Sequence, residues 1–108
     1  MALLENGNNR ESSARVLAFA DSQNDVSVQI GAIQELGQLR RPLYENEITF
    51  IRKHLESNNQ YVRKKSVESV GRLSGAVRST FLTLITRIAT DPHETEETRS
   101  LANHVLTQ

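Results

Sequence analysis

The side chains able to do chemistry are few in this sequence and stand apart from one another. Three histidines, His54, His93 and His104, fall in different predicted elements and lack the H-x-x-x-H spacing that brings two imidazoles to one metal ion. The chain has no cysteine, so it offers no thiolate ligand and no cysteine nucleophile. It also lacks a glycine-rich phosphate loop and a G-x-S-x-G motif. The sequence therefore predicts a protein that is not an enzyme and that holds no metal ion or cofactor.

Charge is the chemical feature that is concentrated along the chain. The net charge is zero, but residues 40–88 carry ten basic against four acidic residues, a net +6. Residues 1–39 carry two against five, and residues 89–108 carry one against four, so each end has a net charge of −3. A basic middle between acidic ends favours an acidic partner, or the stacking of one copy end to middle on another.

These residues lie on predicted helices. Apolar residues recur at steps of three and four, and no run alternates as a half-buried strand does. The first helix is expected over 11–20, and Asn24 or Asp25 caps the second. Pro42 suits the first turn of the third helix, where its missing N–H costs nothing.

The second half of the chain continues the same pattern. Ser57 to Asn59 breaks the third helix and caps the fourth, which ends near Leu73 before a stop at Ser74 and Gly75. A fifth and a sixth helix follow. The residues expected to face inward include Ala14, Leu17 and Ala18 in the first helix and Leu82, Ile85 and Ala89 in the fifth.

A repeat of 34 residues runs through the helices. The stretch "SVQIGAIQELGQL" is echoed by "YVRKKSVESVGRL", so that Val28 corresponds to Val62 and Gly37 to Gly71. Glycine inside a helix costs about 1 kcal/mol relative to alanine, so its recurrence at one repeat position indicates a place where a neighbouring helix approaches closely. A third, degraded copy is offset by 36 residues and aligns Arg99 with Arg63.

These stretches resemble the second helix of HEAT repeats, especially the short repeats of the phycobilisome lyase group, whose pattern runs V-R-x-x-A-x-x-A-L-G-x-L. The resemblance covers most of the chain after Arg10. It implies an all-α fold, a right-handed superhelix (solenoid) of three helical hairpins with about six helices. We therefore expect one domain over 1–108, with repeats at about 10–41, 42–75 and 76–108 and flexible residues 1–9.

The resemblance also implies a binding face, because the second helices line the concave side of HEAT-like solenoids. Helical spacing places a set of exposed residues on the outer side of those helices. The predicted partner-binding residues are Tyr61, Lys64, Lys65 and Arg72, with Gln34, Gln38 and His104 as rim contacts. Each of these could equally be a solvated surface residue, and Glu68 to Arg72 is a favourable i,i+4 pair.

Other residues of the second helices are given structural roles. Arg63 and Arg99 lie nearer the buried edge, where we expect a packed stem and a guanidinium bonded to a loop carboxylate or carbonyl. Ser66 follows "RKK" as in a kinase site, but it aligns with Ala32, which predicts burial.

We therefore expect a protein-interaction scaffold or adaptor that binds an acidic peptide or protein and either self-associates or belongs to a longer array. A nucleic-acid-binding module that uses the basic middle is the alternative, and a bilin lyase-like or phycobilisome-associated protein is a lower one. With only Tyr44 and Tyr61 beside three phenylalanines, aromatic residues to hold a base or a tetrapyrrole are scarce. No apolar run reaches the length of a membrane span and no secretion signal is recognised, which predicts a soluble, cytoplasmic protein.

Overall fold

The computed structural model describes residues 10–108, and the expected flexibility of residues 1–9 lies outside this range. Within it the chain is all-helical and has no strand, as predicted. A single-turn helix α6 (Gly75–Arg78) and a 3-10 turn η1 (Ser79–Phe81) lead into the fifth long helix. The six longer helices are α2 (Arg10–Ser22), α3 (Val26–Leu36), α4 (Glu45–Leu55), α5 (Gln60–Arg72), α7 (Leu82–Thr90) and α8 (Glu96–Leu106).

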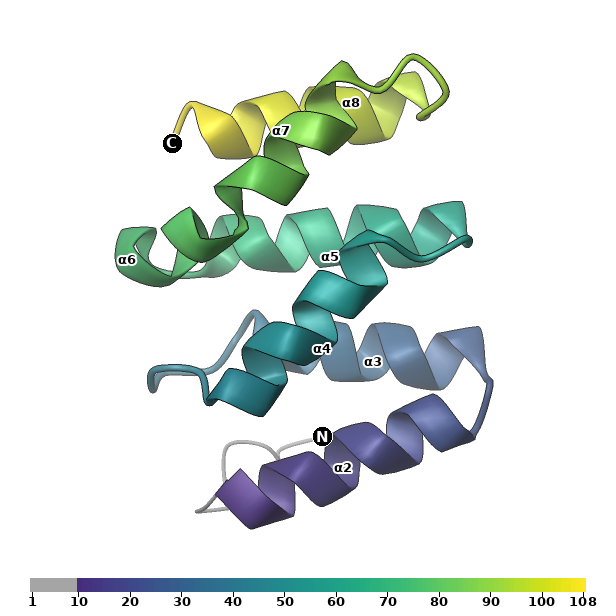
Figure 1. Ribbon diagram of the computed structural model, residues 1–108, viewed down its shortest axis with the longest axis vertical. Coiled ribbons are helices and arrows are strands. Elements are labelled where there is room, and N and C mark those ends of the chain that lie inside the picture. Colours follow the sequence, from purple (N-terminus) through teal and green to yellow (C-terminus); the bar gives the residue numbers. More distant parts are fainter. Residues whose placement is uncertain (1–9) are drawn as a thin grey trace.

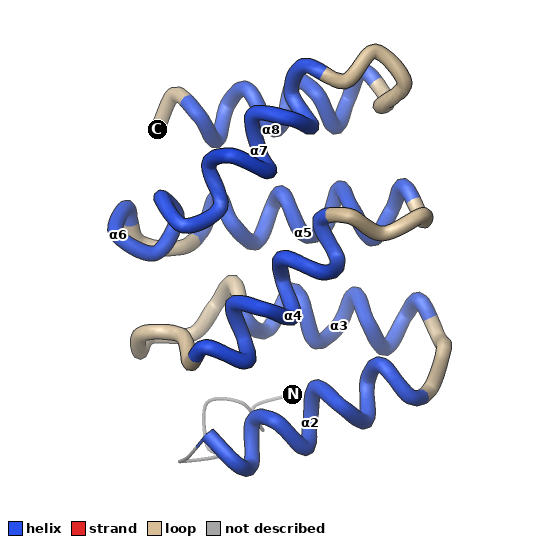
Figure 2. Tube along the Cα trace, in the orientation of Figure 1, coloured by secondary structure: helices blue, strands red, loops and turns tan. Residues whose placement is uncertain are grey.

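The helices form two layers. In one layer α2 contacts α4 and α4 contacts α7, and in the other α3 contacts α5 and α5 contacts α8 (Figure 1). The short connections within each helix pair lie along one edge, and the longer connections between pairs lie along the opposite edge (Figure 2). We call α2–α3, α4–α5 and α7–α8 hairpins one, two and three. Hairpins one and three form the two ends of the stack.

The second helix of each hairpin begins with a side-chain cap. Asp25 accepts a hydrogen bond from the Ser27 N–H at 2.9 Å, and Asn59 accepts one from the Tyr61 N–H at 2.8 Å. Thr95 Oγ1 accepts one from the Thr98 N–H at 3.2 Å. These caps stand 34 and 36 residues apart, so the predicted repeat spacing is also the spacing of the helix starts.

The third helix does not begin at Pro42, and this prediction is wrong. Its N-cap is Tyr44, whose backbone N–H donates to the Glu47 carboxylate at 2.7 Å. Arg41 donates two hydrogen bonds to the same carboxylate, at 2.7 and 2.8 Å, and its guanidinium lies 4.1 Å from the centre of the Tyr44 ring. Residues 41–44 are thus held as a non-helical loop by a carboxylate in the first turn of α4.

The inward faces of the first helices also differ from the prediction. Ala14 and Ala18 are exposed, whereas Ser13, Leu17 and Ala20 are buried. In α7 and the preceding turn, Leu82 is exposed and Ala89 half-buried, and the buried residues are Phe81, Ile85 and Ile88.

One shared register explains these corrections. Ser13, Glu47 and Phe81 stand 34 residues apart and are all fully buried. The Ser13 hydroxyl donates to Glu47 Oε2 at 2.7 Å, so this layer includes polar core residues. A search for apolar periodicity passes over such positions.

Gly37 and Gly71 sit where adjacent second helices approach closely, as predicted. A Cβ atom on Gly37 would lie 2.9 Å from the backbone Cα of Ser69, and one on Gly71 would lie 3.1 Å from Val105 Cγ2. The Ser69 hydroxyl donates to the Ile33 carbonyl at 2.8 Å, which ties α5 to α3 beside Gly37. Each glycine therefore leaves a gap that the next second helix enters, and we call this gap a notch.

Replacement of Gly37 by alanine should destabilise the protein, because the new methyl group would displace the backbone of α5. We expect the free energy of unfolding to fall by about 1–3 kcal/mol, the usual cost of overpacking. Gly31 is the matched control, since it lies within α3, the helix that Gly37 caps, and has open space where a Cβ would stand. Gly31→Ala should raise stability by about 0.5–1 kcal/mol through helix propensity.

Urea unfolding followed by circular dichroism measures both changes. If Gly37→Ala stabilises the chain as much as Gly31→Ala does, the close approach at Gly37 is wrong.

Candidate binding surfaces

The predicted binding residues lie on the outer side of α3, α5 and α8, which we call the second-helix ridge. Tyr61 at the start of α5 is 62% exposed. His104 on α8 is also exposed. Because α5 contacts both α3 and α8, the ridge is continuous across the three hairpins.

Two of the predicted cations on the ridge are already paired. Lys64 forms an ion pair with Glu97 of α8, which raises the pKa of the lysine and lowers that of the glutamate. Lys65 Nζ lies 3.6 Å from a carboxylate oxygen of Glu68. Glu68 therefore pairs with Lys65, whereas the sequence predicted a pair with Arg72. The positive charge of α5 is therefore partly balanced within the ridge.

The remaining predicted residues are spread over the second layer. Arg72 lies eight residues beyond Lys64, about 12 Å along the helix axis, and lines a groove with the loop around Pro42. Gln34 and Gln38 line a different groove, on the outer side of hairpin one. The seven predicted residues thus form no single pocket.

The groove on hairpin one has a volume of about 530 Å³. We call the surface around it the first flank. Its lining combines six small or apolar residues with three polar ones. Phe19 stands on its rim with 61% of its surface exposed, which is unusual for a phenylalanine. The lining residues are Val16, Phe19, Ala20, Val28, Gly31, Ala32, Gln34, Glu35 and Gln38.

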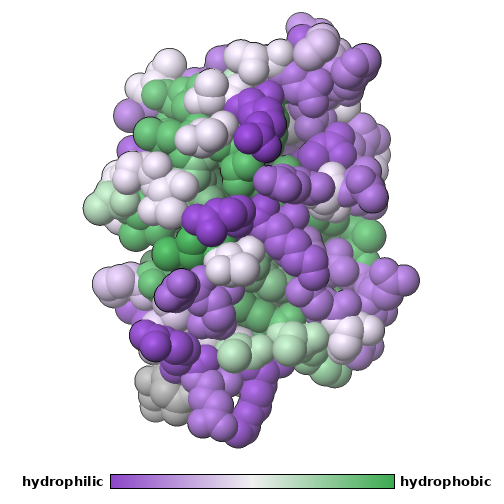
Figure 3. All heavy atoms as spheres, viewed as in Figure 1, coloured by the Kyte–Doolittle hydropathy of each residue, from purple (hydrophilic) through white to green (hydrophobic). Residues whose placement is uncertain are grey.

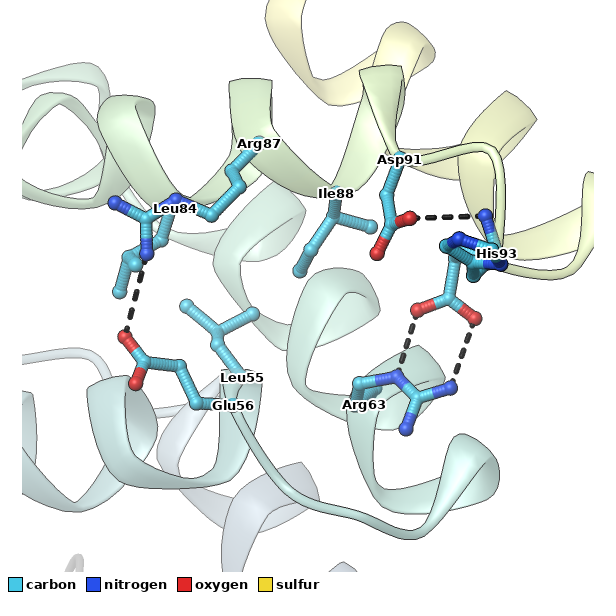
Figure 4. A pocket seen from close by; sticks show the side chains of 9 residues that line it. Leu55, Glu56, Arg63, Leu84, Arg87, Ile88, Asp91 and His93 are labelled. Atoms are coloured by element: carbon cyan, nitrogen blue, oxygen red, sulfur yellow. Dashed lines mark hydrogen bonds and ion pairs between the residues drawn. The ribbon is translucent and has the colours of Figure 1, made fainter.

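A second hollow, of about 330 Å³, lies where α4, α5 and α7 meet (Figure 4). Leu55, Leu84 and Ile88 contribute apolar surface to it. Its charged groups are engaged: Arg63 donates to both carboxylate oxygens of Glu94, at 2.6 and 3.0 Å, and to the Ser57 carbonyl at 2.9 Å. The expected structural role of Arg63 is confirmed, with the carboxylate supplied by the loop before α8.

The Arg63 pair explains two pKa shifts in this hollow. The hydrogen bonds to Glu94 raise the pKa of Arg63, and the same bonds hold the pKa of the nearly buried Glu94 below its ordinary value of 4.5. Arg99, the equivalent of Arg63, differs from the prediction, because its Nε is buried without a hydrogen-bond partner. Ser66 is buried as predicted, and its hydroxyl donates to the Val62 carbonyl at 2.8 Å.

Two ionisable groups lie inside the layer formed by the first helices of the hairpins, α2, α4 and α7, which we call the first-helix layer. Burial would raise the pKa of Glu47, but the hydrogen bonds from Arg41, Ser13 and the Tyr44 backbone outweigh it and hold the value below 4.5. His54 is 96% buried, and this burial lowers its pKa below 6.5 despite an Asp21 carboxylate 3.0 Å from Nε2. Lys53 pairs with the other oxygen of Asp21.

Neither site was found from the sequence. The buried carboxylate and imidazole occupy positions 34 residues from Ser13 and Ala20, so the repeat register identifies them as inward-facing. An alignment of the first helices at the 34-residue spacing therefore predicts that Glu47 and His54 face inward, which the pattern of apolar residues does not.

The described residues offer little else for chemistry. Residues 10–108 contain no cluster of three His, Cys, Asp or Glu side chains placed to hold a metal ion. None of the helices described is both long and apolar enough to cross a membrane. On the face of α2, α4 and α7, apolar patches alternate with polar side chains (Figure 3).

No family model matches the sequence, and no curated protein or solved structure matches it significantly.

Acidification should destabilise the protein in two separate pH ranges. Because folding lowers the pKa of His54, protonation favours the unfolded chain, so its contribution is complete above pH 6.5 and is lost as the pH falls below that value. Glu47 and Glu94 have lowered carboxyl pKa values, so their contributions are complete above pH 4.5 and disappear below it.

Melting temperatures measured across these two ranges test this account. His54→Gln should remove the loss in the upper range and leave the lower one, whereas the exposed control His104→Gln should change neither. Persistence of the upper loss in His54→Gln would refute the assignment to His54.

Proposed function

We propose that the protein is a HEAT-like solenoid of three helical hairpins that acts as a non-catalytic protein-interaction module. It binds an acidic peptide or protein on the second-helix ridge. The observation that carries the proposal is the side-by-side packing of α3, α5 and α8, which joins their outer faces into one surface across all three hairpins.

Features of the ridge support recognition of a protein chain. Tyr61 presents an exposed aromatic ring with a hydroxyl group, a residue type enriched where proteins bind each other. Arg72 is exposed at the far end of α5, and Lys64 and Lys65 lie between them with surface-level ion pairs that an incoming carboxylate can exchange. The ridge therefore offers an aromatic anchor and cations along one helix.

The basic middle supports nucleic-acid binding less well. Of the ten basic residues between 40 and 88, at least six form ion pairs within the described chain, which reduces the positive field available to a phosphate backbone. These six are Arg41, Lys53, Arg63, Lys64, Lys65 and Arg87.

Charge reversal on the ridge should abolish capture of the partner while the fold is kept. Lys65→Glu with Arg72→Glu reverses two charges of the ridge and keeps the Lys64–Glu97 ion pair between α5 and α8, which reversal of Lys64 would break. The matched control is Arg52→Glu with Arg87→Glu, an equal change on exposed residues of the first-helix layer.

Affinity capture from the source organism, compared by mass spectrometry, is the measurement. We expect the ridge variant to capture at least tenfold less partner than the parent protein, and the control variant to capture as much as the parent. Both variants should have the melting temperature of the parent. Equal capture by both variants moves binding off the ridge. Capture of nucleic acid alone, falling steeply with added salt, would favour the alternative.

A further inference from the structure

The first flank repeats the positions that the chain itself uses to join its hairpins. Val16, Val28 and Glu35 on this flank are half-buried. The residues 34 positions later are Phe50, Val62 and Ser69, and these are 95–100% buried where hairpin two packs on hairpin one. Ala32 and its equivalent Ser66 are both buried. The groove of the first flank is therefore a continuation of the interface between hairpins, with its covering hairpin absent from the described residues.

The opposite end of the stack has a different character. The positions that face the next hairpin are Ile33 and Gly37 in hairpin one and Val67 and Gly71 in hairpin two. In hairpin three the spacing of 36 residues places Asn103 and Thr107 there, and both are exposed. At the two positions that meet the next hairpin in the other joints, this end is polar and has no notch.

The polar residues at the outer end of hairpin three make it a poor partner for the first flank. A second copy stacked head to tail would place Thr107, the equivalent of Gly37 and Gly71, against Glu35, the equivalent of Ser69. The Thr107 side chain would block the close approach that glycine permits in the other joints, and the polar Asn103 would be buried beside it. A hairpin with an apolar face and a notch would bury Val16 and Val28, as hairpin one buries their equivalents Phe50 and Val62. The equivalent of Phe19 is Lys53, an exposed residue that still reaches hairpin one through Asp21, so this position lies at the rim of the joint.

We propose that the first flank is a docking site for a helical hairpin of a partner protein. That hairpin presents an apolar face and a glycine notch toward α3. Phe19 on the rim packs against the first helix of the partner, and Gln34 and Gln38 lie at the edge of the joint beside the second-helix ridge. The site adjoins the ridge at Gln34 and Gln38 but includes none of Tyr61, Lys65 and Arg72, so it can fail or hold independently of the ridge proposal.

The chain itself can be made into the probe. Asn103→Val with Thr107→Gly gives hairpin three the apolar residue and the notch that hairpins one and two have. If the first flank accepts a notched hairpin, this variant should associate head to tail, and its weight-average mass in sedimentation equilibrium should at least double from 12.2 kDa with rising concentration. Adding Phe19→Asp should return it to the monomer.

Three controls make the outcome decisive. The parent chain should stay monomeric, and Asn103→Val alone, which lacks the notch, should associate at least tenfold more weakly than the double variant. Val16→Asp repeats the flank test at a half-buried residue, and circular dichroism verifies that each variant keeps its helices. Phe19 is exposed, so its replacement leaves the fold intact.

A folded double variant that remains monomeric overturns the proposal. So does association that survives both Phe19→Asp and Val16→Asp, because it would use another surface. A parent chain that dimerises and is dissociated by Phe19→Asp would instead assign the first flank to a second copy of the protein.

Discussion

The close approach of the second helices is the constraint on which the rest of the structure depends. Ser69 stands so near Gly37 that no Cβ fits between the two backbones, and Val105 is almost as near Gly71. With the helices this close, Val62, Val67 and Val70 lose all contact with solvent although α5 is a polar helix overall. Burial at this joint lets 108 residues with few aromatic side chains hold a core.

Polar contacts also join successive hairpins. Glu47 binds Ser13 of the preceding hairpin and Arg41 of the loop, and Arg63 binds Glu94 of the following one. At the Glu47 position hairpin three has Phe81, which fills the same buried site with a ring. Ionic and apolar residues thus serve one structural position, and the lowered pKa values of Glu47 and Glu94 reflect the ties that keep these carboxylates charged.

Much of the fold could be predicted because backbone constraints are local. The repeat spacing, the cap at Asn59 and the notches at Gly37 and Gly71 follow from residue types with narrow structural uses. The helix start predicted at Pro42 was wrong because the carboxylate of Glu47, five residues later, binds Arg41 and the Tyr44 N–H and holds this segment as a loop. The candidate site was less predictable, since Lys64 meets Glu97 from a helix 33 residues away and no single-helix pattern reveals that pair.

The stack also separates two kinds of surface. The ridge is polar and crosses all hairpins, whereas the first flank is apolar and belongs to one. Both surfaces follow from the close packing of successive second helices.

Nuclear Overhauser contacts in the folded protein test that close packing most directly. The structure predicts cross-peaks from the Gly37 α-protons to the Ser69 β-protons and from the Gly71 α-protons to a Val105 methyl group. A well-resolved spectrum that lacks both would contradict it.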